Sequence, residues 1–530
     1  MIDLSASGAD LGDRHADVCI VGAGVTGQTV ARRLAAAGKS VILCESGGAD
    51  FDNDVQSLAT GPNLGEEYYP LRDSRLRLFG GTTAIWGGRS VALDPIDFIK
   101  RDWIEHSGWP IAYEELDPYV DEAFKALELQ RPRSWSDIGE AQPPFDPDKV
   151  DARIWAFDQK GERFTSATDL DHPKIELVLN ATLTSIRQGE GGEVEALVFK
   201  SLAGTSLTIK ANDYVIAAGG IETPRLLLAC GEDRPDGIGN DHDLVGRFFM
   251  EHPHARGGAI LPLTDDVDGM MKILSLTKQK MSHDGRRFAA AYRPGEAAQA
   301  ELGILNSALS FGIRRHAGQK VAGFQSLISS LKHSLPAKRS FRSTYQQLKK
   351  ATVKLAPRAD SRIAARWLMG KRDLKGLYAV VRAEQAPNPD SRVRLVDEVD
   401  ALGVRRVGLD WRFLEVDRRS VAGLMGLLDE ELQRMGAGRA QPADWLVEGE
   451  KLWDFDPLIS SHPIGGYHHM GTTRMGATER EGVTDAECRV YGAPNLFVAG
   501  SSLFPTSGWA NPTITIVALA LRLGDFLGKR

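Results

Sequence analysis

Cysteine is scarce in this chain of 530 residues, and long apolar runs are missing from it. The four cysteines, Cys19, Cys44, Cys230 and Cys488, lie far apart and lack the close pairs that are typical of zinc sites. No run of about 18 apolar residues occurs, so the sequence predicts no membrane-spanning helix. The first residues have neither a basic leader nor an apolar segment. We therefore expect no signal peptide, reduced thiols and a cytoplasmic location.

Excess charge is modest over most of the chain. The 71 acidic and 64 basic residues give a net charge of −7 and a pI near 6.0, which argues against a general nucleic-acid-binding role. Residues 331–375 are the exception, because they hold 13 Lys and Arg against Asp360 and Asp373, about +11 in all (13 − 2). Such a segment is either a solvated helical insertion or a docking surface for anionic lipid or for an acidic electron-accepting partner.

A glycine-rich turn stands between two predicted strands near the start of the chain. A strand at 16–21 precedes it, and a helix at 28–37 and a strand at 40–44 follow it. This order of elements is that of a dinucleotide-binding βαβ unit. The motif alone does not distinguish FAD from NAD.

The residues of this unit have separate expected tasks. Gly22 permits the tight turn, Gly24 lets a pyrophosphate approach the backbone, and Gly27 allows the helix to pack closely on the strand. Thr26 lies in the same turn. Glu45, at the end of the second strand, can accept a hydrogen bond from a ribose hydroxyl. An acid at that position favours dinucleotide binding over a turn that serves packing alone.

A second glycine-rich loop covers residues 77–89. Its glycines flank bulky side chains, so its backbone can lie against a flat ring while Trp86 packs beside that ring. The candidate ring contacts are Gly81, Thr82, Thr83, Trp86, Gly87 and Gly88.

The C-terminal part of the chain holds a histidine pair, a short apolar strand and a helix. His468 and His469 open the segment His-His-Met-Gly-Thr-Thr-Arg-Met-Gly, and a strand at 495–500 follows it. Asn511 and a proline then precede a helix at 513–527, where the missing proline N–H costs nothing. The start of that helix offers free N–H groups and a partial positive charge to a negatively charged group.

Together these motifs resemble the glucose-methanol-choline (GMC) oxidoreductases. The match rests on His-x-x-Gly-Thr-x-x-Met-Gly from residue 468, on the apolar strand that ends in glycine and on Asn-Pro-Thr-hydrophobic from residue 511. Matching motifs run from about residue 17 to 527 and lean toward the bacterial sugar-oxidising, pyranose-oxidase-like branch. The resemblance implies FAD as the cofactor. It also implies cofactor contacts at Leu183, Ala218, Gly219, Gly500, Ser501, Asn511 and Thr513.

One departure from part of the family concerns how the flavin is held. Relatives that attach flavin covalently carry a histidine in the loop that lies along the isoalloxazine. This chain has Thr83-Ala84-Ile85-Trp86 there. We therefore expect FAD to be bound without a covalent bond.

The resemblance implies a catalytic pair, with His468 as the base and Asn511 as the donor that holds the substrate oxygen. A neutral imidazole titrates near the working pH, which suits this task. His469 is the rival base, but neighbouring side chains in an extended segment face opposite ways. A zinc site at His462, His468 and His469 would lack an acid or a cysteine to complete it, so we expect no metal.

Two other histidines, His252 and His254, stand next to a segment at 245–253 that resembles a domain crossover of the family. A structural role suffices to explain both, so neither is expected to be catalytic.

The expected fold is α/β. The length allows two structural units, and 42% hydrophobic with 25% charged residues is an ordinary globular composition. We expect a Rossmann-like FAD-binding domain of GMC type and an α+β substrate-binding domain with an antiparallel sheet, including a hairpin at 379–395. The expected FAD-binding domain comprises 1–93, 175–254 and 456–530, and the expected substrate-binding domain comprises 94–174 and 255–455, with the basic insertion 331–375.

We therefore predict an FAD-dependent oxidoreductase that oxidises the CH–OH group of a sugar, glycoside or polyol by hydride transfer to flavin N5 with a histidine base. One alternative is a dehydrogenase of an apolar or natural-product alcohol that passes electrons to a quinone or a protein. Alternatives of another class are a flavin monooxygenase and a non-catalytic FAD-binding protein, and the pairing of His468 with Asn511 argues against both.

Overall fold

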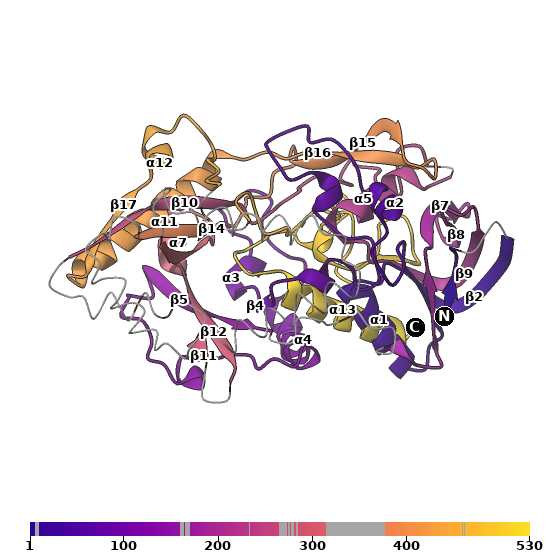
Figure 1. The fold of residues 1–530 in the computed structure, drawn as a ribbon, viewed down its shortest axis with the longest axis horizontal. Coiled ribbons are helices and arrows are strands. Elements are labelled where there is room, and N and C mark those ends of the chain that lie inside the picture. The colour runs from indigo at the N-terminus through magenta and orange to yellow at the C-terminus, as the bar shows by residue number, and fades with distance from the viewer. Residues whose placement is uncertain are drawn as a thin grey trace.

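Two large β-sheets organise the protein (Figure 1). The structure, a computed structural model, describes residues 1–5, 10–158, 164, 170–232, 234–263, 273, 276, 280–281, 285–313, 377–457, 459 and 462–530. The basic segment 331–375 lies outside these described residues. None of the described helices combines the length and the apolar character needed to cross a bilayer.

The first sheet has a parallel centre and carries the N-terminal glycine-rich turn. Its strand order is β1-β6-β3-β2-β9-β8-β7, and β18 pairs with β9. The strands are β1 (Ile2–Asp3), β2 (Asp10–Val21), β3 (Val41–Cys44), β6 (Ile175–Leu179), β7 (Thr182–Gln188), β8 (Val194–Lys200), β9 (Ser206–Ile216) and β18 (Leu496–Val498). Parallel pairing joins β2 to β3 and β9, and β18 to β9. Every residue of β3 is buried, as expected for a parallel strand covered on both faces.

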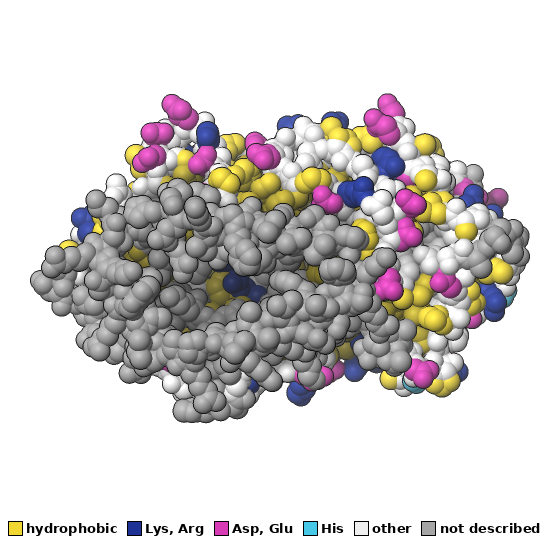
Figure 2. Space-filling model, in the orientation of Figure 1, with side chains coloured by type: hydrophobic (Ala, Val, Ile, Leu, Met, Phe, Trp, Pro, Cys, Tyr) yellow, Lys and Arg dark blue, Asp and Glu magenta, His cyan; other side chains and the backbone are white. Residues whose placement is uncertain are grey.

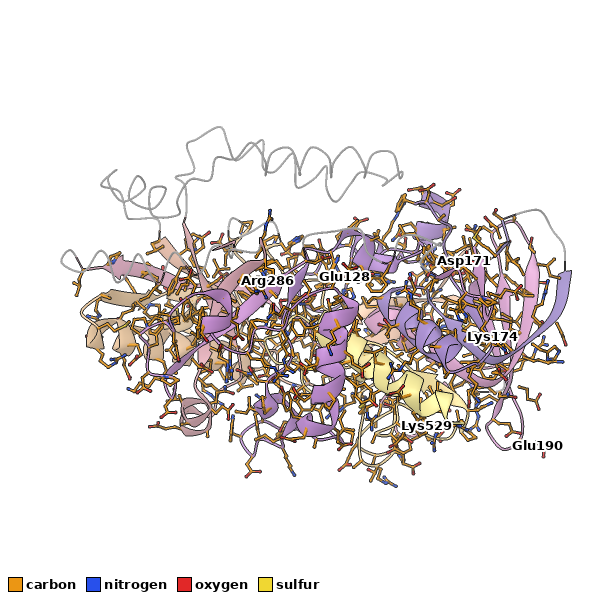
Figure 3. The ribbon with its side chains drawn as sticks, turned by 90° about the horizontal axis from the view of Figure 1, so that it is seen from below. Glu128, Asp171, Lys174, Glu190, Arg286 and Lys529 are labelled. Atoms are coloured by element: carbon orange, nitrogen blue, oxygen red, sulfur yellow. The ribbon has the colours of Figure 1, made fainter. Side chains whose placement is uncertain are left out.

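Three helices pack beside one another near this sheet. They are α1 (Val25–Ala36), α4 (Tyr113–Ala126) and α13 (Thr513–Gly528), and the C-terminal α13 contacts both of the others (Figures 1 and 3). Arg33 of α1 donates to Asp525 of α13 (Nη2 to Oδ2, 2.8 Å), and the Tyr119 hydroxyl of α4 donates to the same carboxylate (3.3 Å). The last helix of the chain is thereby held against the first. A further helix, α5 (Gly219–Ala229), follows β9 of this sheet.

The second sheet is antiparallel. Its order is β17-β10-β14-β13-β12-β5-β4, and β11 pairs with β12. The strands are β4 (Arg89–Ser90), β5 (Val150–Phe157), β10 (His254–Pro262), β11 (Lys280–Met281), β12 (Arg287–Pro294), β13 (Ala308–Ile313), β14 (Leu377–Arg382) and β17 (Gly438–Pro442). The long helix α11 (Glu415–Arg434) packs on it and buries Leu424, Met425, Leu428 and Leu432. The predicted α/β fold with an added antiparallel sheet is confirmed.

The remaining elements are short. They are α2 (Asn53–Ser57), α3 (Pro95–Phe98), α7 (Glu296–Leu302), α12 (Asp444–Glu448), the 3-10 helices η1 (Leu71–Asp73), η2 (Gly81–Ile85), η3 (Ser136–Ile138) and η5 (Ser501–Leu503), and a two-stranded sheet of β15 (Arg392–Val399) and β16 (Arg405–Asp410).

Several predicted elements differ from the structure in their limits or partners. The first helix begins at Val25 rather than residue 28, because the turn already has helical backbone after Gly24. The strand pattern at 175–186 is two strands, β6 and β7, separated at Asn180, whose φ is +56°. The expected hairpin at 379–395 is wrong, since β14 and β15 lie in different sheets and β15 pairs with β16.

The described surface shows no separation of charge on the face seen in Figure 2. Acidic and basic side chains alternate along the upper part of that face. Lys or Arg side chains and hydrophobic side chains are also visible inside a hollow at its centre.

Candidate active site

A cavity of about 550 Å³ is lined by both sheets, by the glycine-rich loop and by the C-terminal segment. Of the sequence-predicted cofactor residues it is lined by Gly22, Gly24, Thr26, Glu45, Gly81, Thr82, Thr83, Trp86, Gly87, Gly88, Leu183, Ala218, Gly219, Gly500, Ser501, Asn511 and Thr513. Gly27 is not among the lining residues. A Cβ on Gly27 would stand 2.0 Å from the Gly22 carbonyl oxygen, so this glycine serves helix–strand packing.

The glycines of the cavity leave bare backbone facing empty space. A Cβ added to Gly24, Gly87, Gly219 or Gly500 would meet no protein atom within 4 Å, apart from chain neighbours. Gly22 is different, because its φ is +103° and a Cβ there would stand 2.5 Å from the Ala217 carbonyl oxygen. A surface of this kind fits a flat ring and a phosphate chain that lie directly against the backbone.

Glu45 lies at the end of β3 and lines the cavity. Its Oε2 accepts the Ala23 N–H and its Oε1 accepts the Gly47 N–H, both at 2.9 Å. Burial raises the pKa of Glu45 to about 7, although these hydrogen bonds oppose the shift. Each carboxylate oxygen has a further lone pair, so the expected ribose contact remains sterically and chemically available.

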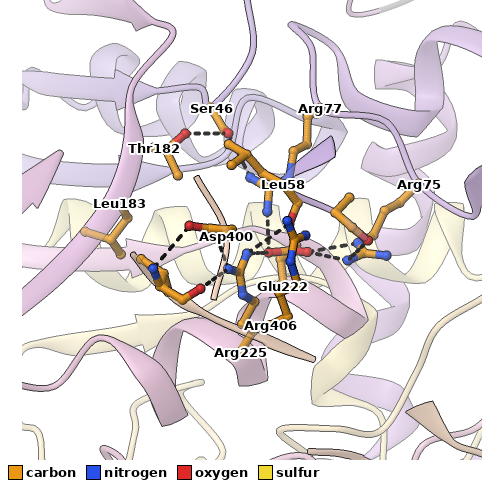
Figure 4. Close-up of polar contacts among 12 residues, drawn as sticks. Ser46, Leu58, Arg75, Arg77, Thr182, Leu183, Glu222, Arg225, Asp400 and Arg406 are labelled. Atoms are coloured by element: carbon orange, nitrogen blue, oxygen red, sulfur yellow. Dashed lines mark hydrogen bonds and ion pairs between the residues drawn. The ribbon is translucent and has the colours of Figure 1, made fainter. Parts of the chain in front are cut away.

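A network of buried charges forms another part of the cavity wall (Figure 4). Glu222 pairs with Arg75, Arg77 (2.5 Å) and Arg225 (3.2 Å), and Arg225 also pairs with Asp400 (2.5 Å). Burial alone would raise the pKa of Glu222, but the three arginines lower it below its usual range. Three guanidinium groups face two carboxylates here, and the excess positive charge suits a cofactor with two phosphates.

His468 stands at the junction of the two sheets and contacts two other polar side chains. Its Nδ1 lies 2.8 Å from His252 Nδ1, and its Nε2 lies 3.3 Å from Asn511 Nδ2. Burial, followed by the neighbouring histidines, lowers the pKa of His468 well below its ordinary value. The ring is therefore neutral at physiological pH.

Hydrogen bonding around His252 determines which nitrogen of His468 carries the proton. His252 Nε2 lies 2.8 Å from the Gly508 carbonyl oxygen, which can only accept, so His252 carries its proton on Nε2. Burial lowers the pKa of His252 to about 4, so this ring is neutral and its Nδ1 is an acceptor. His468 must then donate through Nδ1–H, so its Nε2 carries no proton and accepts the Asn511 Nδ2–H at 3.3 Å.

Glu251 organises the backbone on which His468 stands. Its side chain is fully buried and accepts the backbone N–H of His468 (2.8 Å), of His252 (2.8 Å) and of Gly466 (3.2 Å), and the hydroxyl of Tyr68 (2.6 Å). Burial raises the pKa of Glu251 to about 7, against the effect of these donors. These hydrogen bonds fix the backbone from which the His468 ring projects.

His469 points away from this constellation. Its Nε2 lies 2.9 Å from the Tyr68 hydroxyl, and its ring packs 5.9 Å from the Phe249 ring, centre to centre. Burial lowers its pKa to about 3. Both histidines of the pair line the cavity, yet the contact with Asn511 belongs to His468.

The sequence alone missed the contribution of His252 and Glu251. It assigned His252 a structural role, whereas the structure places this ring in direct contact with His468. The two residues are 216 positions apart, and no local pattern reports such a contact. The tripeptide Glu-His-Pro beside the crossover was the only available signal.

Comparisons with protein-family models agree with this site. Residues 387–520 match the model "GMC oxidoreductase", and residues 17–239 match the model "FAD dependent oxidoreductase". The first match contains His468 and Asn511, and the second contains the glycine-rich turn.

Curated relatives align over nearly the full length of the chain. A 2-methyl-1,2-propanediol dehydrogenase of Mycolicibacterium austroafricanum is 24% identical over 97% of this chain and 95% of that protein. The fructose dehydrogenase large subunit of Gluconobacter japonicus is 23% identical over 96% and 97%, respectively. A paromamine 6'-oxidase of Streptomyces fradiae is 24% identical over 96% and 91%.

Solved structures share the fold. A formate oxidase superposes with a TM-score of 0.54 over 98% of this chain and 99% of that one, at 16% identity. A pyridoxine 4-oxidase superposes with a TM-score of 0.52 over 96% and 98%, also at 16% identity. The two family models, together with the glycine-lined cavity, show that the chain contains an FAD-dependent oxidoreductase domain and a C-terminal GMC oxidoreductase domain.

Proposed function

We propose that this enzyme oxidises the CH–OH group of a sugar, glycoside or polyol, with His468 as the base. The observation that carries the proposal is the unprotonated Nε2 of His468, which is set by the hydrogen bond to His252 and which accepts the Asn511 Nδ2–H at 3.3 Å. The relatives named as acting on fructose, paromamine and a propanediol support a polar alcohol. The fructose and paromamine relatives also support a place near sugar-oxidising enzymes, and we propose the pyranose-oxidase-like branch from the sequence motifs alone.

The residues around His468 have different proposed roles. His468 Nε2 removes the hydroxyl proton, a role that contributes about 10²–10⁴-fold in enzymes of this kind. The Asn511 amide donates to the substrate oxygen and holds it in place. Glu251 fixes the backbone of His468, and the hydrogen bond from His468 Nδ1–H to His252 keeps the ring oriented.

FAD, when bound, supplies the hydride acceptor. The residues that would hold it are the glycines and threonines of the cavity, together with the start of α13 and the loop at 77–89. Pro512 caps α13, so the N–H groups of its first turn are available to a negatively charged edge.

The proposed activity is tested by anaerobic mixing with a panel of sugars, glycosides and polyols. We expect at least one of them to bleach the flavin absorbance without NADPH. Reoxidation with O₂ and with a dye then separates an oxidase from a dehydrogenase. A flavin monooxygenase would bleach only with NADPH, and a non-catalytic binding protein would not bleach at all; either result would exclude alcohol oxidation.

The flavin should be dissociable. Thr83, Ala84 and Ile85 lie in η2 and Trp86 follows it, so this part of the loop offers no histidine for a covalent bond. Acid precipitation of the purified enzyme is expected to release all yellow colour into the supernatant. Colour that stays in the washed pellet would show a covalent flavin.

Location and partners complete the proposal. All four cysteines are free and buried, which supports a reducing, cytoplasmic compartment. The partners are the small alcohol and an electron acceptor, and the basic segment 331–375 is the candidate contact for an acidic acceptor or an anionic membrane. We also propose the domain division expected from the sequence. The FAD-binding domain would comprise residues 1–93, 175–254 and 456–530, and the substrate-binding domain residues 94–174 and 255–455.

A further inference from the structure

Two arginines, Arg89 and Arg382, line the cavity without a carboxylate partner among the residues that the structure describes. Arg89 belongs to β4 at the edge of the second sheet, and Arg382 ends β14 in its interior. Neither forms an ion pair with a described residue. Arg382 Nη1 donates to Ser310 Oγ (3.0 Å), and the Nε atoms of both arginines are buried with no hydrogen-bond partner.

An aromatic side chain holds the two guanidinium groups together. Arg89 Cζ lies 4.6 Å from the centre of the Trp155 ring, and Arg382 Cζ lies 5.5 Å from the same ring. Phe157 supports Arg89 from 5.5 Å. Cation–π contacts of this kind orient a guanidinium group but leave its charge in place. Two positive charges therefore share one wall of the cavity.

This arrangement is energetically unfavourable without a counter-charge. Burial lowers the pKa of Arg89 to about 10, and burial together with the charge of Arg89 lowers the pKa of Arg382 well below its ordinary value. The protein neutralises a comparable buried arginine elsewhere, where Arg101 pairs with Glu384. An anion that enters the cavity would replace the solvation that the arginine pair has lost.

The position of the pair relates it to the substrate rather than to the cofactor phosphates. The glycine-rich turn expected to receive the pyrophosphate belongs to the first sheet, whereas both arginines belong to the second. The charge of Arg89 contributes to the lowered pKa of His468, so it lies within electrostatic range of the base. In strand register, Arg382 lies opposite His254, another cavity residue.

Building on the proposed alcohol oxidation, we propose that Arg89 and Arg382 bind an oxyanion carried by the substrate, so that the preferred substrates are acidic sugars. Guanidinium groups match carboxylate and phosphate geometry with paired N–H donors, and a charge-assisted bond is about twice as strong as a neutral one. The carbinol would then lie toward His468 and the anionic end toward Trp155.

The first experiment compares matched substrates on the flavin-loaded wild-type enzyme. Glucose, glucuronate and glucose 6-phosphate are mixed with it anaerobically, and the rate and apparent Kd of flavin reduction are measured. We expect at least one anion to exceed glucose by about 10-fold or more in rate over Kd. Preference for glucuronate identifies a carboxylate site, and preference for glucose 6-phosphate identifies a phosphate site.

The second experiment removes the charges one at a time. Arg382→Gln and Arg89→Gln are each expected to lower the rate over Kd for the preferred anion by about 10- to 100-fold, so that the preference for this anion over glucose falls by about 10-fold or more. Arg→Lys variants should retain part of the preference. Arg256→Gln is the matched control, because Arg256 lies on the same sheet over the Tyr378 ring (4.4 Å) but pairs with Asp456 and does not line the cavity.

A third measurement uses only the wild-type enzyme, so its result does not depend on whether a variant folds. Acetate is titrated into wild-type enzyme, and the flavin spectrum and the inhibition of alcohol oxidation are followed. Competitive inhibition by acetate but not by acetamide supports the arginine site. If neutral sugars reduce the flavin at least as well as acidic ones and acetate does not compete, the oxyanion site is refuted while alcohol oxidation stands. If no alcohol of either kind reduces the flavin, the proposed function itself fails.

Discussion

Replacing His468 by alanine is expected to slow anaerobic flavin reduction by about 10²-fold or more while FAD stays bound. The substitution removes the Nε2 that accepts the Asn511 Nδ2–H, and the backbone N–H that Glu251 accepts is retained. The FAD-to-protein ratio and the stopped-flow rate of bleaching are the two measurements. Reduction at the wild-type rate would show that His468 is not the base.

His469→Ala is the matched control for this result. It removes an adjacent imidazole that lines the same cavity but contacts Tyr68 instead of Asn511. We expect a loss of stability, because the Tyr68 hydroxyl loses one partner in a buried site, and a much smaller effect on flavin reduction. If His469→Ala slows reduction more than His468→Ala does, the assignment of the base within the pair is reversed.

The second large effect is expected at His252. His252→Phe keeps a flat ring but removes the acceptor for His468 Nδ1–H, and a buried donor left without a partner costs about 1–3 kcal/mol. The base can then adopt the tautomer with its proton on Nε2. We expect flavin reduction to slow by about 10- to 100-fold, with FAD still bound.

A conservative variant separates positioning from packing at this site. His252→Gln supplies an amide oxygen to accept from His468 and an amide N–H to donate to the Gly508 carbonyl. Flavin reduction in His252→Gln should therefore lie closer to wild type than in His252→Phe. A purely packing role predicts the opposite order, because phenylalanine preserves the ring shape better than glutamine does.

Local patterns predicted much of the fold. The βαβ unit around Gly22 and the helix after Asn511 follow from the spacing of apolar residues, glycine and proline, which act within about ten residues. The prediction of a hairpin at 379–395 was wrong because such local patterns do not specify which strands pair. The pattern reported two strands correctly but carried no information on their partners, and β14 pairs with β10 and β13 instead.

The site residues that were not predicted from the sequence reach the site through long-range contacts. Family motifs indicated His468 and Asn511, which lie 43 residues apart and meet at 3.3 Å. His252 and the pair Arg89–Arg382 reach the same cavity from other segments, and their residue types have many roles elsewhere in proteins. Only the packing of the second sheet against the C-terminal segment brings them together.

The position of α13 and β18 affects the order in which the two sheets form during synthesis and the effect of truncating the chain. The first sheet contains β1 and β2 from the start of the chain and receives β18 only from near its end, and α13 packs on α1. A ribosome therefore releases most of the second sheet before the first can close. Neither sheet is encoded by a contiguous stretch, so no single truncation isolates one of them as a foldable fragment. The complete lining of the cavity, which includes Ser501, Asn511 and Thr513, therefore forms only after residue 513 has been made.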